Sequence, residues 1–264
     1  MFSQRLLAYN ETFAPVGAYA KKFPVVACLW NEAVSGRSAS DLANCFYRVI
    51  VHFANLERIT FWLDNCAAQN KNWGLFLFLI IVINSDFIRV KEITLKFFES
   101  GHTFMAADSF HAAVEKKMRQ NPPITYPEFK EVVAQSKGNV TVLDMEPVNF
   151  FPMPLTVSQY TLNKSKTRPY IDRIRKLVVR KGSFALQYSE SVKEDGELKA
   201  CSLLSKKQSM QVSADSFQLQ DVLRPLSSPV GIDSSRKQAL LAVVSPVIKD
   251  DQKSFWNNLP IKMD

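Results

Sequence analysis

ERITFWLDNCAAQNKN, residues 57–72, joins a short apolar segment to a strongly polar one. Residues 59–63 are β-branched, aromatic or aliphatic, which predicts a strand of a buried α/β sheet. The strand ends at Asp64, at the carboxyl edge where open α/β sheets bind their ligands. The four side-chain amides that follow are too polar for a core. A structural alternative is that Asp64 and Asn65 form a turn and cap the next helix.

The composition indicates an intracellular protein with a sizeable core. The chain has 264 residues, 47% of them hydrophobic, and a net charge of +8 that suits an anionic partner. Its four cysteines are far apart and form no CxxC pair, which predicts reduced thiols. Residues 1–5 lack the features of a signal peptide. We therefore expect a nuclear or cytoplasmic location.

The first half alternates strand and helix patterns. Apolar residues of the predicted helix at 38–53 recur at spacings of three and four, giving one face that covers a sheet. The apolar segment 73–83 is too short for a membrane span, which needs about 20 residues, so it predicts a buried helix. The remaining predicted strands lie at 6–13, 24–30, 93–98 and 140–143, and the remaining helices at 108–119 and 126–135.

Three stretches carry a resemblance to a known family: residues 31–45 (NEAVSGRSASDLANC), 64–72 (DNCAAQNKN) and 99–116 (ESGHTFMAADSFHAAVEK). Together they resemble the family called domain of unknown function 7869, over about residues 1–145. The resemblance implies a transposon-derived protein with a ribonuclease-H-like core, a mixed sheet flanked by helices. The order of elements matches that fold from its second strand onward. We expect the chain to lack the first, central strand, which bears the first catalytic carboxylate.

The chemistry implied by the resemblance is two-metal cleavage or transfer of phosphodiesters, with three carboxylates holding Mg or Mn. Asp64 fits the second carboxylate, and Asp108 and Glu115 compete for the third. His111 lies between these two on one helix face, and His102 precedes them, so zinc or manganese is an alternative. The structural alternatives are that Asp108 caps the helix, Glu115 pairs with Lys116 or Arg119, and His102 holds a turn. Without the first carboxylate, we expect catalysis to be incomplete and any metal to bind weakly or not at all.

The second half predicts a small antiparallel sheet with a cationic outer face. Strand patterns occur at 171–180, 184–189 and 197–204, with tyrosines at 160, 170 and 188 that suit stacking on bases. The alternative is a solvated sheet edge on which lysines discourage aggregation. The expected nucleic-acid-binding residues are Lys71, Lys164, Lys166, Arg168, Arg173, Arg175, Lys176, Arg180 and Lys181.

These patterns divide the chain into a truncated ribonuclease-H-like domain (1–147), a basic β-rich module (155–204), a linker (205–230) and a C-terminal segment with a helical hairpin (231–264). We expect a DNA- or RNA-binding protein that contacts no membrane. No glycine-rich phosphate loop and no GxSxG motif occurs, so no small-molecule substrate is expected. The alternatives are a non-catalytic scaffold for protein contacts, or a divalent-metal nuclease that obtains its missing carboxylate upstream, from Glu32 or from a second chain.

Overall fold

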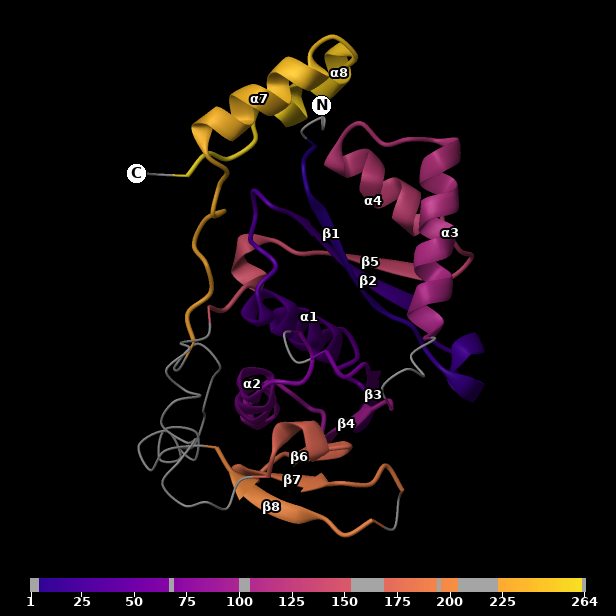
Figure 1. Cartoon of the computed structure of the whole chain (residues 1–264), viewed down its shortest axis with the longest axis vertical. Coiled ribbons are helices and arrows are strands. Elements are labelled where there is room, and N and C mark those ends of the chain that lie inside the picture. Colours follow the sequence, from indigo (N-terminus) through magenta and orange to yellow (C-terminus); the bar gives the residue numbers. More distant parts are fainter. Residues whose placement is uncertain are drawn as a thin grey trace. The chain divides into compact units, whose positions relative to one another are not determined.

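The computed structural model describes residues 5–66, 69–99, 105–152, 169–193, 196–203 and 223–262. The chain folds into two compact units, each assembled from separate stretches of sequence. Unit 1 comprises Met1–Arg37, Phe104–Phe150 and Leu226–Asp264, and unit 2 comprises Ser38–Thr103 and Phe151–Pro225. Figure 1 shows the elements of both units, which are described separately below.

The predicted mixed α/β class is confirmed. The described residues form two mixed sheets and six helices, in the order predicted from the sequence. None of these helices has the length and apolar character that a membrane crossing requires. The buried helix predicted at 73–83 is α2, Trp73–Asn84, in which every residue from Leu75 to Asn84 is buried.

Unit 1 contains a three-stranded sheet in the order β1-β2-β5. The central strand β2 pairs antiparallel with β1 and parallel with β5. It is nearly continuously apolar because both neighbours and the packed helices exclude it from water. The strands are β1 (Ala8–Phe13), β2 (Val25–Asn31) and β5 (Val140–Asp144).

Two helices of unit 1, α3 (Ala106–Gln120) and α4 (Tyr126–Ala134), lie beside this sheet (Figure 1). Their apolar residues form one core with β2, composed of Ala27, Leu29, Phe110, Val114, Tyr126 and Val133. The capping box of Thr125 and Glu128 fixes the start of α4. On its polar side α3 contacts the edge strand β1 through His111 and Thr12.

The predicted C-terminal helices are α7 (Ser234–Val244) and α8 (Asp250–Asn257). Their apolar residues join a second cluster of unit 1, made of Ala33, Ile232, Leu240, Trp256 and Leu259. Arg236 donates hydrogen bonds of 2.9 and 2.7 Å to the Glu32 carboxylate. Glu32, the alternative source of a catalytic carboxylate, is therefore held in a salt bridge.

Unit 2 contains a five-stranded sheet in the order β3-β4-β6-β7-β8. Strands β3 and β4 are parallel, whereas the pairs β4–β6, β6–β7 and β7–β8 are antiparallel. The β-rich segment of the second half thus extends the sheet that begins with β3 and does not form a separate one. The strands are β3 (Arg58–Leu63), β4 (Glu92–Phe97), β6 (Lys176–Arg180), β7 (Ala185–Ser189) and β8 (Lys199–Ser202).

The helices of unit 2 cover one face of this sheet (Figure 1). Helix α1 (Ala39–His52) begins with a capping box between Ser38 and Asp41. The Phe46 ring of α1 meets Phe61 of β3 at 5.1 Å between ring centroids, and Phe76 of α2 meets Phe97 of β4 at 6.1 Å. Side chains alternate along a strand, so Trp62 and Lys96 project from the opposite face.

Candidate functional site

The polar loop after β3 is organised by its own hydrogen bonds. The Asp64 Oδ1 atom accepts hydrogen bonds from the Cys66 backbone N–H at 3.1 Å and from Asn70 Nδ2 at 2.8 Å. The Cys66 carbonyl accepts from three backbone N–H groups, those of Gln69, Asn70 and Lys71. The motif therefore forms a tight turn. A turn was the first of the two structural roles predicted for Asp64 and Asn65, the other being the cap of the next helix.

The predicted helix cap is a different residue from Asp64 or Asn65. Helix α2 is capped by Asn72, whose Oδ1 atom accepts from the Leu75 N–H at 2.8 Å. Asn65 instead donates its side-chain amide to the Phe98 carbonyl just after β4. The loop thus links the ends of two parallel strands and starts the helix that buries them.

Lys71 connects this loop by hydrogen bonds to the segment that precedes β6. Its Nζ atom donates to Asn65 Oδ1 at 2.8 Å and to the Asp172 carbonyl at 3.0 Å, and lies 4.9 Å from the centre of the Phe97 ring. Burial, together with the nearby positive charge of Arg175, lowers the pKa of Lys71 to about 8 against the opposing charge of Asp172. Lys71 is 4% exposed, so it positions other residues and does not present its charge to a polyanion.

Asp64 is expected to stabilise the loop as a hydrogen-bond acceptor. In Asp64→Ala, the Cys66 N–H and the Asn70 amide lose their acceptor, which should lower the free energy of unfolding by about 1–3 kcal/mol. Asp64→Asn retains Oδ1 and should cost clearly less. Urea unfolding of both variants tests this, and an Asp64→Ala variant as stable as the parent would contradict it.

The other proposed carboxylates, Asp108 and Glu115, lie on α3 in unit 1. Asp108 is the third residue of the helix and not its cap, but its Oδ2 atom accepts from the Met105 N–H at 2.7 Å and closes the first turn. Glu115 pairs with Arg119 at 3.5 Å, one of the two partners foreseen for it. Both residues thus have structural roles of the kind that their sequence positions suggested.

His111 contacts the edge strand β1. Its Nε2 atom lies 2.9 Å from Thr12 Oγ1, which donates its single proton to Asn10 Oδ1 at 2.9 Å. Burial lowers the pKa of His111, although the charges of Asp108 and Glu115 oppose the shift.

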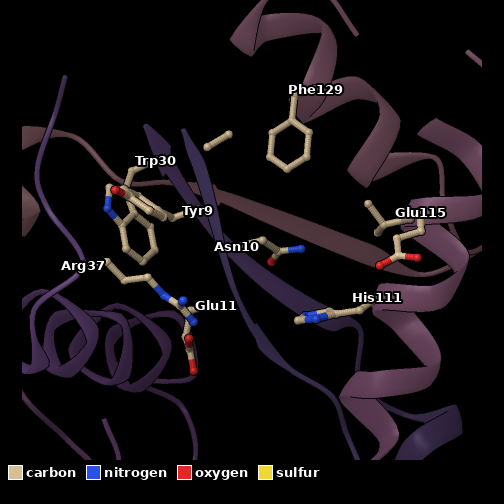
Figure 2. A pocket seen from close by; sticks show the side chains of 10 residues that line it. Tyr9, Asn10, Glu11, Trp30, Arg37, His111, Glu115 and Phe129 are labelled. Carbon is tan, nitrogen blue, oxygen red and sulfur yellow. The ribbon is translucent and has the colours of Figure 1, made fainter. Parts of the chain in front are cut away.

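Around these residues unit 1 has a pocket of about 310 Å³ (Figure 2). His111 and Glu115 project from α3 toward Asn10 of β1, and Phe129 lies above them in this view. On the other side of β1, the rings of Tyr9 and Trp30 are 5.2 Å apart, beside Arg37 and Glu11. The pocket follows an open strand edge and mixes acidic, basic and aromatic side chains.

The structure does not assemble the implied two-metal site among the residues that it describes. The described residues contain no group of three or more His, Cys, Asp or Glu side chains that is placed to hold a metal ion. Asp64 belongs to unit 2, whereas Asp108, His111 and Glu115 belong to unit 1. His102 lies outside the described residues. We therefore derive no catalytic step through Mg or Mn.

Apart from Lys71, the predicted basic residues separate into three groups. Three of them bond within unit 2: Lys176 donates to the Lys193 carbonyl, Arg180 pairs with Glu92, and Lys181 donates to the carbonyls of Ser85 and Ile88. Arg173 is exposed and Arg175 half-buried. The other three, Lys164, Lys166 and Arg168, lie outside the described residues.

A groove at the carboxyl ends of β3 and β4 contains residues that the sequence reasoning missed. It has a volume of about 490 Å³ and is lined by Trp62, Phe97, Phe98, Glu99, Arg175 and residues 190–193. Trp62 is 37% exposed, and Lys96 Nζ lies 5.3 Å from the centre of a Trp62 ring. The alternation along β3, which places Trp62 opposite the buried Phe61 and Leu63, was the signal available in the sequence.

Comparison with known proteins places the chain in a family. No curated protein and no solved structure matches it. A family model described as "Domain of unknown function (DUF7869)" matches residues 31–191, which include the Asp64 loop, α3, strands β3, β4, β6 and β7 of the five-stranded sheet and strand β5 of the three-stranded sheet. Because the match covers more than half of the sequence, the chain belongs to this family of domains of unknown function.

Proposed function

We propose that this protein is a transposon-derived, ribonuclease-H-like protein that binds DNA or RNA without complete catalytic machinery. Support for the fold comes from the order of elements: an antiparallel pair, a helix, then two parallel strands joined by a helix. In this proposal Asp64 acts as an acceptor within its loop. Binding is the function, and cleavage is not.

The observation that carries the proposal is the group of cations at one edge of the five-stranded sheet. Arg175 and Lys193 line the groove, and Arg173 precedes β6 with its guanidinium 5.2 Å from the centre of the Tyr170 ring. Tyr170 is 72% exposed. Arginines beside accessible aromatic rings suit phosphate contacts combined with stacking.

The charge of the chain agrees with such a partner. The net charge is +8, and the acids that neutralise Arg180 and Lys91 lie at the opposite ends of their strands from the groove, although Glu99 and Glu190 lie at the groove itself. Phosphate contacts release counterions, so binding should weaken steeply with salt. A scaffold that binds only proteins would not bind nucleic acid and would therefore not show this salt dependence.

The test is a salt titration of binding to a labelled duplex and a labelled single strand. In the double variant Arg173→Gln/Arg175→Gln, affinity should fall about ten-fold or more, and the slope of log K against log salt should decrease by about 1–2. Lys21→Gln/Lys22→Gln is the control, because it removes the same charge from exposed positions of unit 1. Equal losses in both double variants would indicate non-specific attraction, and no binding at low salt would refute the proposal.

A further inference from the structure

We propose that the groove of unit 2 is a stacking site for single-stranded nucleic acid, with Trp62 as the platform for an unpaired base. This inference rests on the proposed function and names the class of nucleic acid that the site prefers. The groove is formed by Trp62, Phe97, Phe98, Glu99, Arg175 and residues 190–193.

The aromatic side of the groove can receive a flat ring. The rings of Trp62 and Phe98 are 5.1 Å apart with planes inclined by 31°, so they pack against each other, and the part of Trp62 that stays exposed (37%) is the surface left for a base. Phe97, fully buried beneath it, contacts Phe76 and Lys71 and keeps the end of β4 fixed. A large indole exposed at the edge of a sheet, without a role in the core, is typical of a binding surface.

The charged side of the groove suits a sugar–phosphate backbone. Arg175 and Lys193 line it, and Lys96, paired in register with Trp62, brings a third cationic group to the indole. Glu99 and Glu190 also lie at the groove. These carboxylates repel phosphates, so the phosphate contacts are left to Arg175 and Lys193, and the carboxylates are acceptors for hydrogen bonds from base amino groups.

The shape of the site favours one strand over two. A volume of about 490 Å³ lies in the range of about 300–1,000 Å³ that compact organic ligands occupy, which suits an unstacked nucleotide. In a duplex the faces of the bases are already stacked, so Trp62 has no ring to contact. Stacking is tolerant of base identity, and we therefore expect little sequence preference.

The position of the groove is fixed by residues that the family match includes. Lys71 connects Asn65, at the end of β3, to the Asp172 carbonyl before β6, and the Arg175 N–H donates to the Ser189 carbonyl. The Arg175 carbonyl in turn accepts from the Phe97 N–H at 2.9 Å, which fixes the Arg175 backbone beside the end of β4. The polar loop thus has a positioning role for the stacking site.

Fluorescence anisotropy with the full chain tests the inference. The probes are a labelled thymidine oligonucleotide of about 12 nucleotides, within the site sizes of single-strand binders, and a duplex of the same length. We expect the parent protein to bind the single strand more tightly. Trp62→Ala should weaken single-strand binding about ten-fold or more while changing duplex binding little, and Trp62→Phe should retain most of the affinity.

Tyr19→Ala is the matched control, because Tyr19 is 61% exposed and lies in unit 1. It should leave both affinities unchanged, and thermal unfolding of each variant shows that it is folded. Equal affinity for single strand and duplex, with neither altered by Trp62→Ala, would overturn the stacking site and leave nucleic-acid binding standing. Failure to bind either probe at low salt would overturn both proposals.

Discussion

Phe76→Ala is expected to lower the free energy of unfolding by about 3–5 kcal/mol, because it removes a large aromatic ring from the core of unit 2. Phe76 is fully buried in α2, and its ring meets Trp73 at 5.6 Å and Phe97 at 6.1 Å. Alanine leaves a cavity between the helix and β4 that the surrounding aromatic rings cannot fill by small movements. Urea unfolding followed by circular dichroism measures the loss.

The control for this prediction is Phe76→Leu, which keeps most of the apolar volume and should cost clearly less than alanine. Hydrogen exchange adds a spatial readout, since the backbone amides of α2 and β4 should lose protection in Phe76→Ala. A destabilisation below about 1 kcal/mol would mean that Phe76 is not a core residue, because large-to-small core changes cost more than that.

Asn84→Ala is expected to lower the free energy of unfolding by about 2–4 kcal/mol through lost hydrogen bonds. The Asn84 side chain donates to the carbonyls of Ile80 and Ser183 at 2.8 and 3.0 Å and accepts from the Gly182 N–H at 2.8 Å. It thereby joins the end of α2 to the turn between β6 and β7. Alanine leaves the Gly182 N–H and the Ser183 carbonyl without these partners.

Asn121→Ala is the control, because Asn121 is exposed at the end of α3 and should change stability by less than about 0.5 kcal/mol. Gly182 has a φ of +80°, so its turn depends on glycine as well as on Asn84. If Asn84→Ala unfolds like the parent, the turn is held by its neighbours and not by this amide.

Local patterns in the sequence predicted the elements well. The three-and-four spacing of Leu42, Cys45, Phe46, Val49, Ile50 and Phe53 predicted the buried face of α1. The first five are buried, and Phe53, the C-cap, is half-buried. The apolar run after Asn72 predicted a buried helix and is α2. Periodicity is a local property of the chain, and burial of one face follows from it directly.

The candidate site was only partly predictable. The sequence located a polar turn at the end of β3, but Asn72 and not Asp64 or Asn65 caps the next helix. A count of charges placed Lys176 on a cationic surface, whereas it is 5% exposed and bonded to the Lys193 carbonyl. The sequence does not show whether the ammonium group of a lysine is solvated or, as in Lys176, bonded to a carbonyl 17 residues away.

The sequence by itself determined the α/β class, the order of strands and helices, the turn after β3 and the family. Only the tertiary structure decided that β6 pairs with β4, matching Leu95 with Leu177 and Ile93 with Val179 although the two strands are far apart in the sequence. It also decided that Asp64 and Glu115 belong to different units, and that Trp62, Phe98 and Arg175 share one groove. The physical reason is that strand pairing and burial depend on which apolar faces meet in space, and no local periodicity records the partner.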